Sequence, residues 1–212
     1  MSFISEELNE YARQHSTPES PLLEKLHKET LEETFLPHMI SGHIQGRFLS
    51  MMSKLIRPKR VLEIGTFTCY SAICIAEGLQ EGGRIDTIDI DRKKVERIHR
   101  YIKESGKEGV IHFHFGRGQD IIPGLEGDFD MVFIDGDKQG YPHYFDILID
   151  RIVPGGIILV DNCLWHGKVL EDKDDVGTIG IKSINDKIQA DPRVENVLLP
   201  LEDGIMVARK IG

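Results

Sequence analysis

The sequence predicts an α/β domain built on a doubly wound, mostly parallel sheet of seven strands. Two observations lead to this prediction. From Arg60 onward, short apolar runs alternate with helical stretches in five strand–helix units, and such strands are typical of parallel sheets with helices on both faces. The last two strands are joined only by a turn at 202–204. Because so short a connection cannot carry a crossover, one strand near the C-terminus should run antiparallel at the end of the sheet.

A helical segment precedes the sheet and ends before Pro58. Its third helix follows a loop expected at 38–43. A segment of this kind can act as a lid, as a dimer element or as part of a substrate wall, or it can simply pack against the sheet. The three helices are marked by a rough apolar stripe at Phe3, Leu8, Tyr11 and Ala12, by the start signal Ser20-Pro21, and by apolar residues at helical spacing from Ile44 to Leu55.

The remaining elements follow from apolar runs separated by glycine and proline. Together they make a Rossmann-like architecture. The strands are expected at 60–65, 84–90, 110–115, 129–135, 156–161, 194–199 and 203–210. The helices are expected at 70–81 and 92–105, around 145–152 and around 181–188, with a short turn at 119–122.

Composition indicates one globular domain over residues 1–212, with a helical extension at 1–57 and an α/β core at 58–212. Hydrophobic residues make up 40% of the chain, enough for one sizeable core. A net charge of −9 argues against a general nucleic-acid or membrane-surface binder, since both need a basic face. No apolar run is long enough to span a bilayer. Three cysteines without metal-type spacing, and no recognisable signal peptide, predict reduced thiols in a cytoplasmic protein.

The turn after the first strand is a candidate cofactor site. Glu63 and Gly65 lie where this strand ends, and ligands of open α/β sheets bind at the carboxyl ends of the strands. The stretch lacks the G-x-G-x-x-G pattern, which argues against a dinucleotide pyrophosphate. Asp89 ends the second strand, where an acidic residue typically binds ribose hydroxyls. We therefore expect a nucleotide-like cofactor, whereas Asp86 and Asp91 are expected to be solvated.

Strands four and five end in a second group of polar residues. Asp135 and Lys138 follow one strand, and Asp161 and Asn162 follow the other. Both strand ends should face the same crevice, and their oxygen ligands suit a hard divalent cation. The alternative is helix capping and turn chemistry, which favour the same residue types.

The histidines and the tryptophan give weaker signals. His112 and His114 share one strand face, but the middle of a strand is the wrong place for a site, so we interpret both as structural. Trp165 follows Asn162 closely and is expected to form an aromatic wall of the crevice. The sequence assigns no role to His43 or His166.

These motifs resemble those of the class I S-adenosylmethionine-dependent methyltransferases. They are most similar to the cation-dependent O-methyltransferases of the caffeoyl-CoA and catechol type, which include bacterial members. The resemblance covers nearly the whole chain. It rests on several blocks of sequence, of which the block that begins at 133 and the block that begins at 155 are the specific ones. The matching blocks are 61–65 with 70–72, Asp89, 133–138 with Tyr141 and Tyr144, and 155–156 through Asp161-Asn162 to 165–169.

The resemblance implies a role for each matching residue. The cofactor would be S-adenosyl-L-methionine, together with a divalent cation; Mg²⁺ is expected, and Mn²⁺ or Ca²⁺ are the alternatives. Asp135 would serve the metal, the cofactor and catalysis, and Lys138 would be the catalytic lysine. The cofactor-binding set would be Glu63 and Gly65 at the methionine part with Ser71 nearby, Asp89 at the ribose, and Gly118 and Gln119 at the adenine. The metal-binding set would be Asp135, Asp161 and Asn162.

The chain departs from the family pattern in two places. The loop before the third helix usually carries an acidic residue ahead of a Gly-Gln or similar pair, whereas this loop contains His43 and Ile44. Gly136 replaces the usual alanine or histidine after the first metal aspartate. In addition, no feature of the helical extension points to coenzyme A binding.

The resemblance implies a particular reaction, although other acceptors and other functions remain as alternatives. A divalent cation would favour the phenolate of a catechol-like acceptor with vicinal hydroxyls, and Lys138 would take the proton or hold the oxyanion. The expected acceptor is a small phenolic molecule, and a homodimer is expected from the family. Nucleic acid is not expected except as a hydroxylated tRNA nucleoside acceptor. The remaining alternatives are a nicotinamide-dependent oxidoreductase and a non-catalytic binding module.

Overall fold

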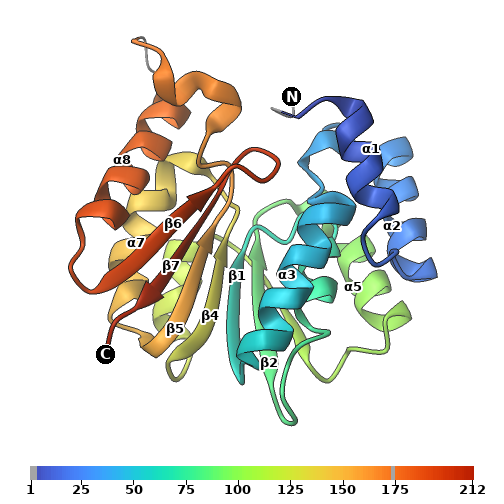
Figure 1. Cartoon of the computed structure of the whole chain (residues 1–212). Coiled ribbons are helices and arrows are strands. Elements are labelled where there is room, and N and C mark those ends of the chain that lie inside the picture. Colours follow the sequence, from blue (N-terminus) through green and yellow to red (C-terminus); the bar gives the residue numbers. More distant parts are fainter. Residues whose placement is uncertain (1–3, 173–174) are drawn as a thin grey trace.

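The chain folds into three layers, with a twisted seven-stranded sheet between two groups of helices (Figure 1). The computed structural model describes residues 4–172 and 175–212, so Phe3, expected in the first helix, lies outside the described residues. The strands are β1 Arg60–Ile64, β2 Arg84–Asp89, β3 Ile111–Phe115, β4 Phe129–Ile134, β5 Ile152–Val160, β6 Val194–Leu199 and β7 Ile205–Lys210. The α-helices are α1 Glu6–Gln14, α2 Pro21–Glu33, α3 Gly42–Ile56, α4 Tyr70–Ile75, α5 Val95–Glu104, α6 Gly118–Ile121, α7 Tyr141–Ile149 and α8 Val176–Ala190. The 3₁₀ turns are η1 Pro37–Met39, η2 Arg92–Lys94, η3 Ile122–Gly124, η4 Lys138–Gly140 and η5 Trp165–Leu170.

The sheet has the strand order β3-β2-β1-β4-β5-β7-β6. Five strands pair in parallel, and β7 runs antiparallel to both β5 and β6. This confirms the predicted fold class, although β7 lies between β5 and β6 and not at the edge of the sheet. The order reverses between β1 and β4, so the connections from these strands leave in opposite directions. Ligand crevices of doubly wound sheets form at such a reversal.

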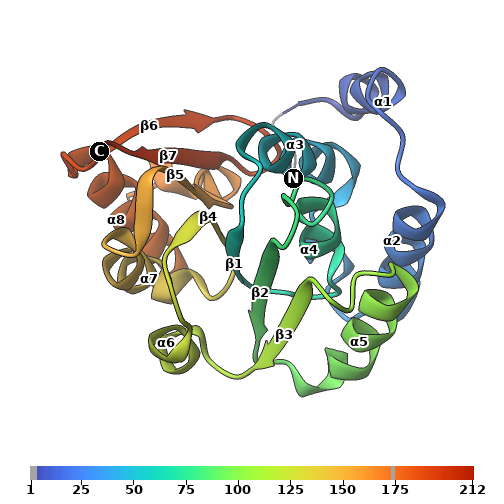
Figure 2. The ribbon, with the colours of Figure 1, turned by 90° about the horizontal axis from the view of Figure 1, so that it is seen from below.

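Two apolar clusters fill the spaces on either side of the sheet. One joins the strands to α7 and α8, through buried residues such as Phe145 and Ile184. The other joins them to α2, α3, α4 and α5, through residues such as Leu26 and Leu49. Figure 2 shows α6, α7 and α8 on one face and α3, α4 and α5 on the other. Burial on both faces explains why the central strands are almost wholly apolar.

Several predicted elements have different limits in the structure. α4 ends at Ile75 and does not reach 81, because the chain turns and brings Gly78 against α3, where a Cβ would lie 2.3 Å from Lys54 N. The expected loop at 38–43 contains η1 and the start of α3. The apolar stripe of α1 does form a helix, but Leu8 and Tyr11 are each 60% exposed.

Asp86 is buried, which corrects the expectation that it is solvated. Only 1% of the residue is exposed, because neighbouring side chains surround its carboxylate. His114 Nε2 lies 2.9 Å from Asp86 Oδ1, and Arg60 and Arg84 both approach Oδ2 within 3.3 Å. This pairing accounts structurally for one histidine of β3.

Among the described residues, no helix has the length and apolar character needed to cross a membrane.

A network around Glu77 anchors α3 to the core. Arg47 donates to both carboxylate oxygens of Glu77, at 3.0 and 2.8 Å, and Ser50 and Lys54 donate at 2.7 and 2.9 Å. Burial opposes ionisation, but these hydrogen bonds outweigh it and lower the pKa of Glu77 to about 2. Because Arg47 is only 14% exposed, loss of Glu77 would leave a poorly solvated cation.

We therefore expect Glu77→Gln to lower the free energy of unfolding by about 2–3 kcal/mol at neutral pH. The pKa of Glu77 lies below its ordinary value of 4.5, so the charged network stabilises fully above that pH and loses its effect as the pH falls toward 2. Urea unfolding of both proteins should show the difference shrinking over that range. Glu81→Gln, at an exposed residue, is the control. Equal stabilities at neutral pH would contradict the anchoring role.

Candidate active site

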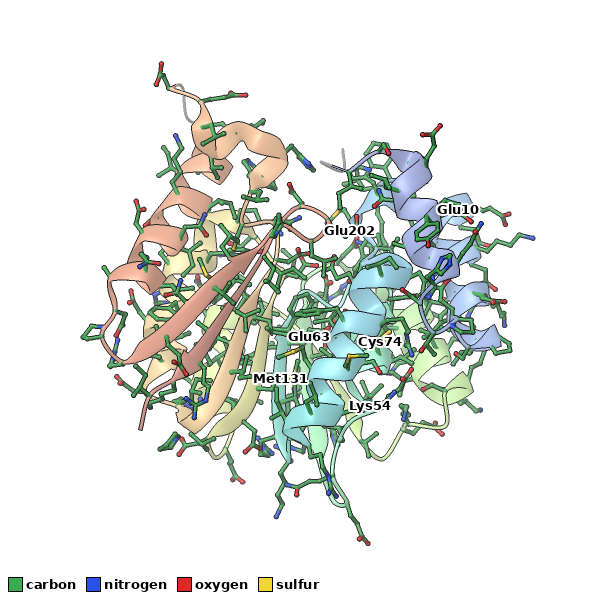
Figure 3. All side chains as sticks on the ribbon, in the orientation of Figure 1. Glu10, Lys54, Glu63, Cys74, Met131 and Glu202 are labelled. Atoms are coloured by element: carbon green, nitrogen blue, oxygen red, sulfur yellow. The ribbon has the colours of Figure 1, made fainter. Side chains whose placement is uncertain are left out.

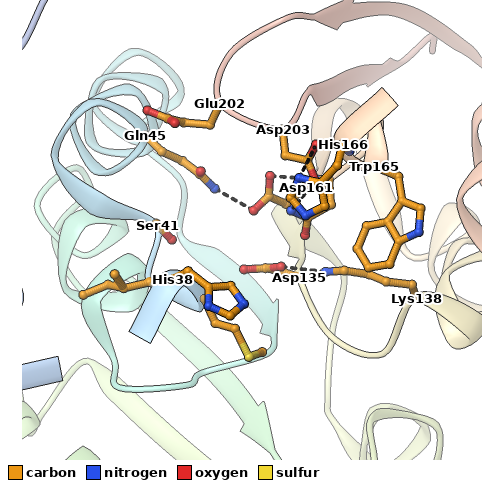
Figure 4. Close-up of a pocket in the computed structure, with 13 residues that line it drawn as sticks. His38, Ser41, Gln45, Asp135, Lys138, Asp161, Trp165, His166, Glu202 and Asp203 are labelled. Carbon is orange, nitrogen blue, oxygen red and sulfur yellow. Dashed lines mark hydrogen bonds and ion pairs between the residues drawn. The ribbon is translucent and has the colours of Figure 1, made fainter. Parts of the chain in front are cut away.

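Two adjacent cavities open at the carboxyl ends of the parallel strands. The larger, of about 750 Å³, lies over the ends of β1 and β2, and the smaller, of about 320 Å³, lies over the ends of β4 and β5. Asp135 and Met39 line both cavities. Figure 4 shows the smaller cavity, on which side chains converge from η1, α3, the segments that follow β4 and β5, and the β6–β7 turn. The residue that follows β4 is therefore placed where two ligands would meet.

Gly65 allows the turn that follows β1 to lie directly against the backbone that follows β4. Its φ angle of +104° is rarely adopted by other residues, and a Cβ on it would lie 2.2 Å from the backbone oxygen of Asp135. A hydrogen bond also joins the ends of β1 and β4, because Asp135 N donates to Ile64 O at 2.8 Å. Gly65 N donates to Ile88 O at 2.9 Å. The glycine thus brings the ends of β1, β2 and β4 together beneath the larger cavity.

Asp89 lines the larger cavity, and its carboxylate is held by the backbone. Phe67 N donates to Oδ2 at 2.7 Å and Asp91 N donates to Oδ1 at 2.8 Å. An ionised carboxylate has about four acceptor positions, so each oxygen keeps capacity for one more donor. This arrangement fits a pair of ribose hydroxyls.

Glu63 and Ser71 lie beneath this cavity and line neither of the two. Glu63 is fully buried, as Figure 3 shows by its place among the core side chains. Thr87 donates to Glu63 Oε2 at 2.5 Å, while Oε1 has no partner among the described residues. Burial raises the pKa of Glu63 to about 8, although hydrogen bonds from Ser71 and Thr87 act to lower it. The free acceptor atom fits a donor supplied by a cofactor or a bridging water.

The far end of the larger cavity is formed by Gly118, Gln119 and an aromatic ring. Gly118 approaches Tyr144 so closely that a Cβ would lie 2.9 Å from a ring carbon. Tyr144 OH donates to Asp137 Oδ1 at 2.6 Å, which fixes the ring. Gln119 is exposed at the cavity margin. A flat apolar wall with polar groups at its edge suits an adenine ring.

Lys138 and Asp135 form an ion pair at the junction of the two cavities. Lys138 Nζ donates to Asp135 Oδ1 at 2.9 Å and to Tyr141 OH at 2.6 Å. The two charged side chains are 16% and 18% exposed, so both remain accessible. Burial raises the pKa of Asp135, and the charge of Lys138 opposes this effect.

Asp161 and Asn162 follow β5 and also line the smaller cavity. Gln45 of α3 donates to Asp161 Oδ2 at 2.8 Å, and Asn162 N donates to Oδ1 at 2.7 Å (Figure 4). Asn162 has a left-handed φ of 59°, and its side-chain amide donates to Asp203 at 3.2 Å. This bond leaves the amide oxygen of Asn162 available. Burial and the charge of Asp135 raise the pKa of Asp161 to about 7.

These residues fit a hard divalent cation. Two carboxylates that share a buried pocket repel one another, and a cation between them would relieve that repulsion. The amide oxygen of Asn162 supplies a third ligand atom. Within the described residues, no group of three His, Cys, Asp or Glu side chains is placed to bind a metal, so a three-ligand set depends on this asparagine.

Two buried polar residues of the smaller cavity were missed in the sequence. Gln45 is 3% exposed and Asp203 is 8% exposed. Gln45 lies among the apolar residues on the buried side of α3. A polar residue at such a position indicates that its side chain has a buried hydrogen-bond partner. Asp203 looked like an ordinary turn residue, but it accepts hydrogen bonds from Asn162 and from His166 N.

The structure places Trp165, which was expected as an aromatic wall of the crevice, and the histidines to which the sequence assigned no role. Trp165 and His166 line the smaller cavity, both with positive φ angles, of 47° and 54°. Such backbone strain is common at functional sites. His43 lines neither cavity, and its Nε2 lies 2.7 Å from Thr17 O. His38 of η1 also lines the smaller cavity, a contact that the sequence did not indicate.

Known proteins of similar sequence include several O-methyltransferases. A model of the O-methyltransferase family matches residues 13–211. The caffeoyl-CoA O-methyltransferase of Stellaria longipes is 32% identical over 98% of this chain and 91% of its own length. Caffeoyl-CoA O-methyltransferase 1 of Eucalyptus globulus is 36% identical over 82% of this chain and 76% of its own length.

Two solved structures share both the fold and a substantial part of the sequence. An O-methyltransferase from Bacillus cereus in complex with SAH has a TM-score of 0.89 and 28% identity, covering 96% of this chain and 97% of that chain. The O-methyltransferase TomG from Streptomyces achromogenes, in complex with SAM, has a TM-score of 0.89 and 30% identity, covering 97% of this chain and 96% of that chain. The chain therefore belongs to the O-methyltransferase family of S-adenosylmethionine-dependent enzymes.

Proposed function

We propose that the protein transfers a methyl group from S-adenosyl-L-methionine to a hydroxyl of a small phenolic acceptor with vicinal hydroxyls, with the help of a divalent cation. The observation that carries the proposal is that the two cavities meet at Asp135. The larger cavity has the volume of a nucleoside-sized ligand site. The smaller one holds the candidate metal ligands and Lys138. A donor and an acceptor bound in these cavities would face one another at their junction.

The cofactor would be held along the larger cavity. Asp89 would accept from the ribose hydroxyls, and Gly118 would let the adenine approach Tyr144. Gly65 would keep the floor free of a side chain. The deep position of Glu63 supports an indirect role, in which its free oxygen accepts from the cofactor's amino group through water or a small shift.

Asp135, Asp161 and Asn162 would hold the cation. When bound, Mg²⁺ or a similar ion would lower the pKa of a phenol, which is near 10 in tyrosine, and the cofactor would supply an electrophilic methyl group. Lys138 lies beside Asp135 and would receive the phenolic proton or stabilise the oxyanion. Tyr141 would orient the Lys138 ammonium group by its hydrogen bond. The main contribution of the protein would be to align the two partners.

The smaller cavity supports a small acceptor more than a tRNA nucleoside. Among the described residues that line it, Lys138 is the only lysine or arginine, and it already pairs with Asp135. Phosphates of RNA would need further cations at the margin of the site. Because the chain belongs to the O-methyltransferase family, we no longer interpret it as a nicotinamide-dependent oxidoreductase or as a non-catalytic binding module. A homodimer and a cytoplasmic location stay predictions.

Asp89→Ala should weaken binding of S-adenosylmethionine by about 30-fold or more, because two charge-assisted hydrogen bonds to the ribose would be lost. Isothermal titration calorimetry would measure the change. Asp120→Ala removes an equal charge from an exposed residue that lines neither cavity, and should bind normally. Unchanged affinity in Asp89→Ala would place the ribose elsewhere.

Asp161→Asn should reduce methylation of a catechol by at least about 100-fold, because the cation site would lose a carboxylate. Cofactor affinity should remain close to that of the parent protein, since Asp161 lines only the smaller cavity. Transfer of a labelled methyl group, with Mg²⁺ and after chelation by EDTA, would test both points. Full activity of the variant, or full activity of the parent protein in EDTA, would refute the metal role.

A further inference from the structure

The smaller cavity is lined by more acidic groups than basic ones. Four carboxylates line it: Asp135, Asp161, Glu202 and Asp203. A divalent cation would offset the charges of Asp135 and Asp161. Asp203 accepts from Asn162 and from the backbone N–H of His166. Glu202 is the carboxylate that has no such partner.

Glu202 is partly buried and unpaired. It forms no hydrogen bond or ion pair with any described residue, although it lines the cavity. Burial raises the pKa of Glu202, and the nearby guanidinium of Arg13, which lowers it, is itself held by Glu6 and Glu10. A half-buried carboxylate that makes no hydrogen bond and no ion-pair contact with the described residues is costly, and a cationic ligand in direct contact with it would reduce that cost.

The backbone and the position of Glu202 support a role in ligand contact. Its φ angle is 49°, in the left-handed region that glycine occupies most easily. A glutamate at such a turn position is therefore not explained by backbone preference. Figure 4 places Glu202 at the end of the cavity beyond Gln45, whereas Lys138 lies at the other end. An acceptor with its hydroxyls near Lys138 would extend a substituent toward Glu202.

We propose that Glu202 selects acceptors that carry a protonated amine and disfavours acceptors with carboxylate or coenzyme A groups. This inference rests on the proposed function, since it assigns the acceptor of the same cavity. The cavity volume of about 320 Å³ suits a single aromatic ring with a short side chain. With Lys138 engaged by Asp135, the described lining offers no free cation to receive an anionic group.

Three catechols with the same ring would test the charge preference: one with an aminoethyl, one with a hydroxyethyl and one with a carboxymethyl substituent. Their saturated chains keep the electronic properties of the ring similar. Caffeoyl-CoA is the polyanionic fourth acceptor. The kcat/KM for methyl transfer should fall in the order amine, alcohol, carboxylate, with about tenfold between amine and alcohol. Caffeoyl-CoA should be no better than the carboxylate.

Glu202→Gln should lower kcat/KM for the amine about tenfold and leave the alcohol within about twofold. Glu81→Gln, with the same charge change at a distant exposed residue, should alter neither. A carboxylate or caffeoyl-CoA preference in the parent protein would overturn the inference, and so would an equal loss for amine and alcohol in Glu202→Gln. Methylation of the alcohol without any charge preference would leave the proposed function standing. Failure to methylate all four acceptors would refute both.

Discussion

The contact between Gly65 and the backbone of Asp135 is the constraint on which the site depends. The two residues end neighbouring parallel strands, and the space between them has no room for a side chain. Because β1 and β4 lie at the reversal of strand order, their ends form the floor of a crevice. The close approach fixes where Asp135 leaves the sheet. Its side chain is thereby placed between the larger and the smaller cavity.

Parts of the chain that are distant in sequence complete the smaller cavity. Gln45 from α3 holds Asp161, and Asp203 from the β6–β7 turn holds Asn162. The Glu77 network fastens α3 to the segment that follows α4, so the position of Gln45 depends on that anchor. The antiparallel placement of β7 between β5 and β6 brings the turn beside the end of β5. Folding and site geometry are therefore linked through a few buried polar contacts.

Much of the fold could be predicted from the sequence, because apolar strands alternate with periodic helices. The strand ends also identified Asp89, Asp135, Asp161 and Asn162 as candidates, since local sequence determines which residue follows a buried strand. Gln45 and Asp203 could not be predicted, because their partners lie 116 and 41 residues away. The length of α4 depended on the contact of Gly78 with α3, and the depth of Glu63 depended on packing around Thr87. These features arise from tertiary contacts that no local pattern records.

The central claim is that donor, cation and acceptor converge at Asp135. The most direct test is a crystal structure of the protein with S-adenosylhomocysteine, Mn²⁺ and a catechol, with the metal located by its anomalous scattering. We expect a manganese peak bounded by Asp135, Asp161 and Asn162. We also expect the cofactor sulfur in the larger cavity, facing a catechol oxygen in the smaller one. A metal bound elsewhere, or a catechol outside the smaller cavity, would contradict the claim.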